Sequence, residues 1–544
     1  MNGRRNRIKL KSVLSIILFI FSIVFTIIMR QRDYVVALSE PLYTEVYKIT
    51  ELFQVRQIIA SLFFFFVGYL IITVIIPELP DIFRMILAIP TSIVVWGTIS
   101  IIVLLLRLPY TKQLMFLIQG ILAIVFIYIL ARRKTLALRH FLQFIIRLAV
   151  VSSFVNIIST GIIRYTVASD TYYYIYTYGR LIAKAGKLSA ESMGNLLETT
   201  GLMMAVMASF AVFCGFETIQ IIHFMLIFSF LGLLVYYLYH IICTYGADKK
   251  KAGVIVAFIL GCAISPLFLI SNLIISHSWM MVFLFICSFY MKEYINTINY
   301  NIRQKIIGIM SLYLLWMSFL RIEAIITILF LIVCFTYLGI SRRELLILSF
   351  PTLVMNAVFH IEMQFLIRRA NDHLSYGTVF VTPKALIIIF LAIILMGGYI
   401  VFYNIKLLKI MRGHLPVIII VSLLAASVII CLPDKERTIN NFHSIFYNLA
   451  NERWYYFPHL VALLTLIILK GKKNYGFWDM ITFGMILLNF AMCMGRVQYL
   501  RDGWGDSFNR YLLQAVPFML VFLTDNIGEI VYGLEKAERA KTSI

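Results

Sequence analysis

The residues best suited by type and spacing to do chemistry lie in a long polar stretch, 164–200. Asp170 follows directly on an apolar run, and Tyr172 and Tyr173 come just behind it in a group of five tyrosines. A carboxylate at the end of a membrane span can act as a general base or help to bind a metal ion. It can equally cap a helix, because Ser169 and Asp170 precede a helix-compatible run. The tyrosines can contact sugars or lipid headgroups, or form an interfacial aromatic belt.

Two further polar stretches carry arginines beside acids. Arg368 and Arg369 lie close to Asp372. Two guanidiniums can hold a phosphate, whereas a solvated loop with an internal Arg–Asp pair is the ordinary interpretation. Arg321 and Glu323 lie at one turn between two apolar runs. They either pair only with each other, or Arg321 faces a lipid phosphate.

Two single residues complete the candidates. His277 is a lone histidine at a predicted turn, where contact with a sugar and simple packing are both open. Arg510 lies in the polar run 501–510, whose charged residues are individually more often structural than catalytic. We predict that Arg321, with the arginine pair described above, can bind a phosphate. Contact with a sugar or another hydroxyl-bearing ligand is assigned to His277, Asp372 and the two tyrosines behind the acid.

The elements that must position these residues are membrane-spanning helices. The chain has 544 residues, of which 61% are hydrophobic and 14% charged, against about a quarter charged in soluble domains. Apolar runs of membrane-spanning length recur throughout, and they are too long and too uniformly apolar for barrel strands. The sequence therefore predicts an all-α polytopic membrane protein with about sixteen transmembrane helices. The predicted spans are 13–29, 57–76, 83–106, 113–131, 142–163, 217–243, 252–270, 279–294, 306–320, 324–340, 345–360, 385–405, 415–432, 457–469, 476–495 and 511–531.

The distribution of charge predicts the orientation. The net charge is +22, but the lysines and arginines lie in short segments between spans, which favours topology and anionic lipid over nucleic acid as the cause. Their density is higher on the side of the N-terminus, so we predict both termini inside and a site facing outward from the cell membrane. The predicted inner turns are 132–139, 249–251, 406–412 and 470–473, and the predicted outer loops are 30–56, 164–200, 361–384, 433–456 and 496–510.

Two short segments are predicted to be helices that do not span. Residues 201–214 are apolar but too short, so we predict a re-entrant or interfacial helix. Within 171–190, apolar Ile182 and Leu188 alternate with Arg180 and Lys184 at helical spacing. This pattern predicts one or two juxtamembrane helices on the outer surface.

Cysteine usage gives no sign of a metal site. The seven cysteines lie in or beside apolar runs, and their spacing does not match a metal motif. The sequence therefore requires no metal ligand set and no identified cofactor, although a divalent metal at the acid of the polar stretch stays open.

Several short motifs resemble the GT-C glycosyltransferases, which are multi-span enzymes that use polyprenyl-phosphate-linked sugars. The resemblance covers roughly 142–531. The motifs are the acid-bearing loop ending in Arg180-Leu-Ile-Ala-Lys-Ala-Gly-Lys-Leu188, the turn Phe213-Cys-Gly-Phe216, the stretch from Ser265-Pro-Leu-Phe268 to Ser276-His-Ser278, and Asn509-Arg510-Tyr511 with Pro517.

This resemblance implies an inverting glycosyltransferase with a polyprenyl-phosphate sugar donor and a lipid- or polymer-linked acceptor. Asp170 would be the catalytic base, and Arg510 with Arg368 or Arg369 would face the donor phosphate. The chain departs from the family layout, because four spans precede the core, the loop holds a single acid, and no large outer domain follows. We therefore divide it into an N-terminal four-helix module, 1–141, and a GT-C-like catalytic core, 142–544.

The sequence leaves two alternative functions open. A transporter or flippase of lipid-linked sugars should have polar or broken helices at mid-membrane. Charges within the predicted spans are scarce, with Arg147 the main one, which favours an enzyme. A surface-polysaccharide polymerase or ligase would have a similar layout with arginine-rich outer loops, and its substrate would be a lipid-linked repeat unit.

Overall fold

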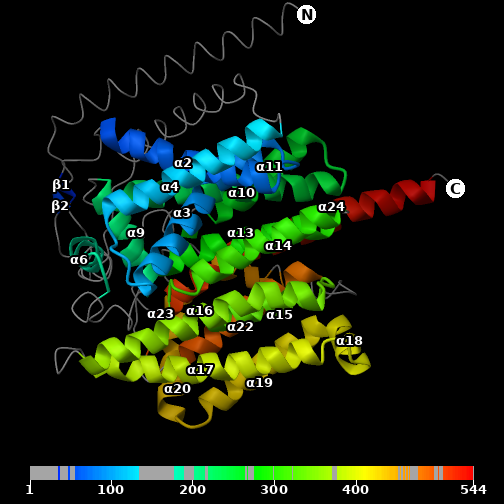
Figure 1. Cartoon of the computed structure of the whole chain (residues 1–544). Coiled ribbons are helices and arrows are strands. Elements are labelled where there is room, and N and C mark those ends of the chain that lie inside the picture. The colour runs from blue at the N-terminus through cyan, green and yellow to red at the C-terminus, as the bar shows by residue number, and fades with distance from the viewer. Residues whose placement is uncertain are drawn as a thin grey trace, which may run out of the picture.

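The structure is a computed structural model of the chain, dominated by helices that run roughly side by side (Figure 1). It describes residues 35–36, 47–48, 55–133, 177–188, 201–214, 219–263, 266–267, 275–297, 299–321, 323–369, 376–450, 454, 457–459, 461–463, 465, 476–494, 500 and 507–542. The helices are α2 (Val55–Ile75), α3 (Asp81–Leu105), α4 (Lys112–Arg132), α6 (Thr177–Ala185), α9 (Leu202–Phe213), α10 (Gln220–Thr244), α11 (Lys249–Cys262), α13 (Ser276–Asn296), α14 (Tyr300–Met317), α15 (Ala324–Thr336), α16 (Arg342–Arg369), α17 (Tyr376–Val401), α18 (Lys406–Gly413), α19 (Leu415–Cys431), α20 (Lys435–Leu449), α22 (Phe477–Met494), α23 (Ser507–Leu512), the 3-10 helix η3 (Leu513–Ala515) and α24 (Val516–Thr542).

The predicted all-helical class is confirmed, with one small addition. The only strands among the described residues are β1 (Val35–Val36) and β2 (Tyr47–Lys48), which pair antiparallel with Val35 opposite Lys48. Six helices in the described part of the chain are long and apolar enough to cross a membrane, or seven if the bent pair α17–α18 forms one span. The chain therefore has the helices of a membrane protein.

The predicted number of about sixteen spans is not confirmed. Several helices that fall on predicted spans are short; α15 has 13 residues and α19 has 17. Predicted spans 13–29 and 142–163 lie outside the described residues. The predicted loop 361–384 is wrong in extent, because α16 continues to Arg369 and α17 begins at Tyr376. Glutamine, glutamate and arginine are good helix formers, so the helix outlasts its apolar run.

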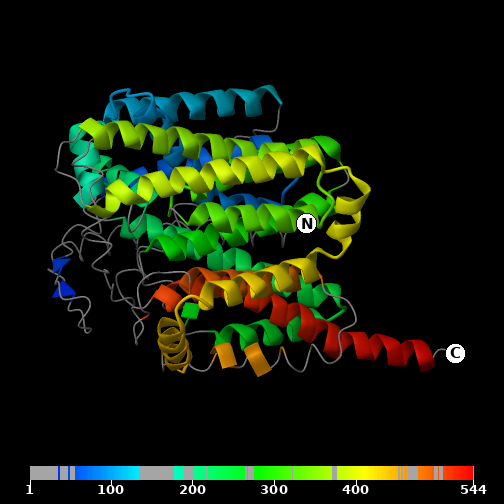
Figure 2. The same ribbon diagram turned by 90° about the horizontal axis from the view of Figure 1, so that it is seen from below.

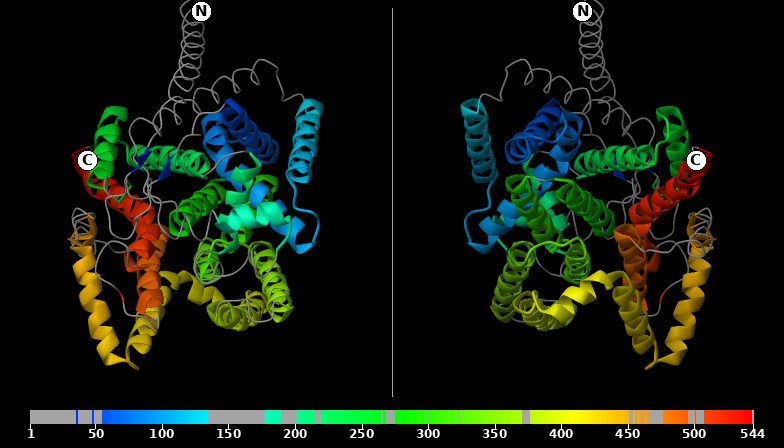
Figure 3. Two further views of the ribbon diagram at one scale, coloured as in Figure 1. Left: turned by 90° about the vertical axis from the view of Figure 1, so that its left-hand side faces the viewer. Right: turned by 90° about the vertical axis from the view of Figure 1, so that its right-hand side faces the viewer.

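The centre of the bundle is formed by α13 and the first half of α24. Nearly every residue of α13 is buried, including Trp279 and Phe283. The ring centroids of these two residues lie 6.0 and 4.3 Å from that of Trp316 on α14. The indole N–H of Trp279 also donates to Nδ1 of His223 on α10, at 2.9 Å. The end-on views show the other helices arranged around this centre (Figure 3).

The outermost helices expose apolar side chains on their outward surfaces. Ile124 on α4, Ile394 on α17 and Ile429 on α19 are 68%, 69% and 66% exposed. In water such apolar surfaces would be costly, whereas a bilayer covers them without penalty. The view from below shows α4 and α17 on the outside of the bundle, and α24 extending past its neighbours toward the C-terminus (Figure 2).

Helix α2 crosses α3 at very short range because position 68 is glycine. A Cβ atom on Gly68 would lie 1.9 Å from the carbonyl oxygen of Ala88, so a larger residue cannot fit. The N–H of Gly68 donates to Oγ of Ser92 at 2.8 Å. Since α3 also packs through Trp96 on Phe210 of α9, the N-terminal helices join the same apolar core as the later ones. The predicted boundary between 141 and 142 lies outside the described residues, and the two-domain division stays a prediction.

We call the end of the bundle that carries α6, α9 and α23 the α9 end, which is on the left in Figure 1 and faces the viewer in the left panel of Figure 3. The helix predicted within 171–190 is confirmed in part as α6, whose Ile182 is fully buried while Arg180 and Lys184 are exposed. Residues 171–176 and 189–190 lie outside the described residues, and the placement on the outer membrane surface stays a prediction. Helix α6 packs on α9 at Gly179, where a Cβ atom would lie 2.5 Å from that of Ala208.

Helix α9 keeps to this end of the bundle. The N–H of Met203, near its start, donates to the carbonyl of Phe319 at 3.0 Å. Toward its other end, Ser209 Oγ is 2.8 Å from Oη of Tyr110, which lies two residues before the start of α4. Both neighbours lie at the α9 end, so the 12 residues of α9 do not pass through the bundle. The predicted short, non-spanning helix at 201–214 is consistent with this arrangement.

We call the opposite end the α18 end. Helix α18 is bent by 105° from α17, and none of its residues is buried. A capping box at the start of α16 ties this end together: Ser341 N–H donates to Glu344 at 2.7 Å, and Glu344 also accepts from Tyr294 Oη on α13 at 2.8 Å. The predicted inner residues Lys249, Lys250 and Lys251 begin α11 at this end (Figure 1).

Candidate functional site

A buried polar cluster at the α9 end brings together three segments that are far apart in the chain. The first turn of α13 contributes Ser276 and His277, the turn between α14 and α15 contributes Arg321 and Glu323, and α23 contributes Tyr511. We call these five residues the Arg321 cluster. Each segment reaches this end because a helix begins or ends there, and the packing of α13, α14 and α23 against one another places the three turns side by side.

Arg321 is the centre of the cluster. Its Nε and Nη2 atoms lie 2.7 and 2.6 Å from Oε1 of Glu323, and the side chain is only 11% exposed. Its Nη1 atom donates to Ser276 Oγ at 3.2 Å and lies 3.4 Å from Nδ1 of His277. A charge this deeply buried is tolerated when it is paired and hydrogen-bonded. The guanidinium is therefore held in one orientation by groups on two separate turns.

Glu323 joins the turn to α23. Tyr511 Oη donates a very short hydrogen bond to Oε1 of Glu323, the oxygen that also accepts from Arg321. Burial by itself would raise the pKa of Glu323, but the charge of Arg321 and the hydrogen bond from Tyr511 outweigh it and lower the pKa. Glu323 is thus an anion at neutral pH, and the pair has no net charge.

His277 and Tyr511 pack edge to face with ring centroids 4.9 Å apart, and the guanidinium carbon of Arg321 lies 5.9 Å from the centroid of the Tyr511 ring. His277 is 3% exposed. The ring of Tyr511 therefore contacts both the histidine and the cation, while its hydroxyl contacts the carboxylate. One residue of α23 holds the two other turns in register.

A second layer of polar side chains surrounds the cluster. Trp454 Nε1 donates to Oδ1 of Asn509 at 2.9 Å, Asn489 Nδ2 donates to the carbonyl of Tyr511 at 2.9 Å, and Asn441 Oδ1 accepts from the N–H of Leu500 at 2.8 Å. Four buried polar atoms on the helices α13, α20 and α22 and on η3 have no hydrogen-bond partner among the described residues: Ser278 Oγ, Asn441 Nδ2, Asn489 Oδ1 and Gln514 Oε1. Buried polar atoms normally bond to protein or water, so this end of the bundle has unused donors and acceptors.

The polar stretch that contains Asp170 ends directly beside the cluster. Gly201, the residue after 164–200, has a φ of 69°, and a Cβ atom there would lie 2.4 Å from the carbonyl oxygen of Leu320. Glycine adopts this left-handed conformation without strain and leaves room for the close approach. Leu320 precedes Arg321, so Gly201, the first residue after the acid-bearing stretch, lies against the backbone at the start of the Arg321 turn.

Three of the predicted site residues lie at this end in the described part of the chain. His277 and Arg321 contact each other, and Arg510 is half-buried beside Tyr511 in α23. The sequence analysis did not assign a role to Tyr511, although it quoted the residue in the Asn-Arg-Tyr motif. It also missed Trp454, whose position in a polar stretch between two apolar runs was the available signal.

None of the other predicted site residues has a side chain within the described part of the structure. Arg368 and Arg369 are the last helical residues of α16, and their side chains lie outside the described residues. Phe359, earlier on α16, packs on Phe319 at 5.4 Å. Nine residues of helix then carry Arg368 about 14 Å farther along the axis. Asp170, Tyr172, Tyr173 and Asp372 lie outside the described residues, so their assignment stays a prediction.

The described part of the chain contains no group of three or more His, Cys, Asp or Glu side chains that could hold a metal ion. All seven cysteines are free, and all are buried or half-buried. Within these residues the α9 end offers one paired guanidinium, Arg321, together with hydrogen-bonding side chains on three segments.

None of the protein-family models, curated proteins or solved structures compared with this chain matches it.

Proposed function

We propose that the chain is an integral membrane glycosyltransferase that moves a sugar from a polyprenyl-phosphate donor to an acceptor hydroxyl at the outer face of the membrane. The observation that carries the proposal is the Arg321 cluster with its neighbour Gly201. It combines a buried guanidinium, the α23 segment that bears Arg510, and the end of the acid-bearing stretch. A lipid phosphate and a polar acceptor need these two kinds of group in one place.

The orientation follows from the distribution of basic residues. Lys249 to Lys251, Lys406 and Arg412 lie at the α18 end, as the density of lysine and arginine along the chain predicts for the inner side. The positive-inside rule then assigns the α18 end to the cytoplasm and the α9 end to the outside. On this assignment the Arg321 cluster faces outward, where lipid-linked sugars serve as donors because nucleotide sugars are confined to the cytoplasm.

The proposed chemistry divides between a base and the arginines. The carboxylate of Asp170 takes the proton of the acceptor hydroxyl, whose oxygen attacks the anomeric carbon of the donor sugar. The bond from that carbon to the phosphate oxygen breaks, and the configuration at the anomeric carbon is inverted. The leaving phosphate gains negative charge as it departs, and Arg510 and Arg321 stabilise it. Arg368 and Arg369 lie farther along α16, and their predicted contact with the donor phosphate would require the phosphate to lie between them and the Arg321 cluster. A divalent metal is not required by this scheme.

The test is transfer of a radiolabelled sugar from polyprenyl phosphate in membranes that contain Asp170→Asn. Removing a general base lowers transfer by about 10²- to 10⁴-fold. The matched control is Asp434→Asn, because Asp434 caps α20 at the same end by accepting from the N–H of Arg437 at 2.9 Å. Asn caps helices as well as Asp does, so this control should keep its activity. Equal activity in the two variants would show that Asp170 is only a helix cap.

A further inference from the structure

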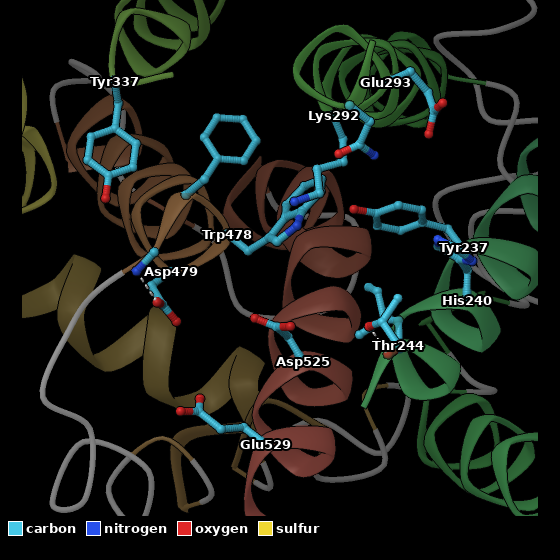
Figure 4. A pocket seen from close by; sticks show the side chains of 14 residues that line it. Tyr237, His240, Thr244, Lys292, Glu293, Tyr337, Trp478, Asp479, Asp525 and Glu529 are labelled. Atoms are coloured by element: carbon cyan, nitrogen blue, oxygen red, sulfur yellow. Dashed lines mark hydrogen bonds between the residues drawn. The ribbon is translucent and has the colours of Figure 1, made fainter. Parts of the chain in front are cut away.

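A cavity at the α18 end lies far from the Arg321 cluster and has no part in the proposed transfer. Its volume is about 780 Å³, and it opens between the ends of α10, α13 and α15, the start of α22 and the middle of α24 (Figure 4). Cavities of this size accommodate small organic molecules and lipid headgroups.

Three carboxylates form one wall of the cavity. Asp525 and Glu529 lie four residues apart on α24 and so share a face of the helix, and Asp479 lies near the start of α22 (Figure 4). Asp525 accepts from Tyr245 Oη at 2.8 Å, and Asp479 accepts from the N–H of Gly476 at 2.6 Å. Burial and then the charges of Asp525, Glu529 and Asp479 together raise the pKa of Tyr245. The three charges therefore act on one small volume.

An aromatic surface lies beside these carboxylates. Tyr237, Phe477 and Trp478 are each less than 10% exposed, and all three line the cavity with Tyr337. The Trp478 ring packs edge to face on Tyr237 and Phe477, with centroids 5.6 and 5.2 Å apart. Figure 4 shows Trp478 and Tyr237 above the carboxylate of Asp525. Aromatic faces and carboxylates attract the same ligands, because the electron-rich ring faces favour cations.

The opposite rim has a different character. Lys292 and Glu293 at the end of α13 and His240 on α10 lie there. The described lining holds four carboxylates and one lysine, and three of the four carboxylates lie on the wall formed by α22 and α24. Carboxylates are therefore concentrated on that wall.

We propose that this cavity binds an organic ammonium group, held between the carboxylates of Asp479, Asp525 and Glu529 and the rings of Trp478 and Tyr237. A metal ion fits less well, because the described residues contain no group of three acids, cysteines or histidines close enough to hold one. Carboxylates spread over a large cavity suit a bulky cation whose charge is shared among several partners. Lys292 on the rim can at the same time contact an anionic group of the same molecule.

Two sources offer this chemistry, a free amine and the headgroup of a zwitterionic lipid. The test is isothermal titration of the purified full chain in a detergent that lacks amines. Choline and spermidine are the free ligands. Bicelles that contain phosphatidylethanolamine are compared with bicelles that contain phosphatidylglycerol. Heat from the free amines identifies a soluble ligand, and heat from phosphatidylethanolamine alone identifies the lipid headgroup. No saturable binding in any arm overturns the proposal.

Variants assign the binding to this cavity. Asp525→Asn keeps an oxygen for Tyr245, and Glu529→Gln changes an exposed residue, so both should fold. Each should weaken binding about tenfold, since each removes one charge from the wall. The control is Glu362→Gln, which removes an acid paired with Arg107 at the α9 end and should leave the affinity unchanged. Equal affinity in all three variants would place the ligand elsewhere, and the outcome is independent of any transferase activity.

Discussion

The two ends of the bundle handle buried charge in opposite ways. At the α9 end, Arg321 and Glu323 are paired within 2.7 Å and are further bonded to Ser276 and Tyr511. At the α18 end, Asp479, Asp525 and Glu529 line one wall of a cavity, and Lys292 lies on the opposite rim beside Glu293. A closed cluster must balance its charges because it is shielded from water, whereas charged groups around a cavity can also interact with a ligand. The comparison distinguishes a cluster whose charges contact each other from carboxylates that line a cavity.

The largest effect should come from Arg321→Gln. This substitution leaves Glu323 buried without its cation and removes a guanidinium assigned to the donor phosphate. Loss of both should lower sugar transfer by at least about a hundredfold. The measurement is transfer in membranes with protein amounts equalised.

The double variant Arg321→Gln with Glu323→Gln separates the two causes. It removes the unpaired charge and lets two amides bond to each other, so the fold should recover. If Arg321 binds the phosphate, transfer stays low in the double variant. If Arg321 only neutralises Glu323, transfer recovers, and the assignment of the phosphate site to the α9 end is wrong.

A smaller effect is expected from Tyr511→Phe. The ring contact with His277 remains, but Glu323 loses one hydrogen bond. A hydrogen bond to a charged group contributes about 1.5–3 kcal/mol, and loss of register between α23 and the Arg321 turn should lower transfer about tenfold. Tyr447→Phe on the exposed side of α20 is the control and should behave as the native chain. Equal effects of both substitutions would remove any special role of Tyr511.

Acid should weaken the α9 end through Glu323. Its pKa is lower in the folded chain than the ordinary value of 4.5, so its charge stabilises the fold fully above that value. The contribution is lost as the pH falls through the lowered pKa. Thermal unfolding in detergent should show native and Glu323→Gln proteins differing by a constant amount at neutral pH and converging below about pH 4. A difference that does not change with pH would contradict the ion pair.

The smallest effect should be that of Asp525→Asn on transfer. The cavity and the Arg321 cluster share no residue, so changes at one should leave the other within about twofold. Transfer by Asp525→Asn and amine binding by Tyr511→Phe are measured on the same preparations. A large loss in either would mean that the two ends are coupled, and the comparison between them would then describe one site.

The helical class and the segments of the α9 end could be predicted from the sequence, because apolar runs and polar turns are local features. His277, Arg321 and Arg510 were each found as polar residues at the end of an apolar run. The contact between His277 and Arg321 could not be derived, since it depends on how α13 and α14 pack. The same applies to Tyr511, whose hydroxyl meets Glu323 across 188 residues of chain.

The cavity at the α18 end gave almost no signal in the sequence. Asp525 and Glu529 lie in one predicted span or near its end, and Asp479 lies at the start of another, where an acid is an ordinary capping residue. Their common wall exists only because α22 and α24 pack together. The extent of α16 was also missed, because the apolar run ends before the helix does.

The anchoring of α6 on α9 sets a limit on where the predicted base can act. Only six residues lie between Asp170 and Thr177, the first residue of α6, so seven Cα–Cα steps connect them. A chain of that length reaches at most about 25 Å when fully extended. Gly179, two residues into the helix, is fixed against Ala208. Asp170 must therefore lie within this distance of the α9 end. Inserting residues between Asp170 and Thr177 would lengthen the connection and let the acid move farther away, without changing any group of the Arg321 cluster.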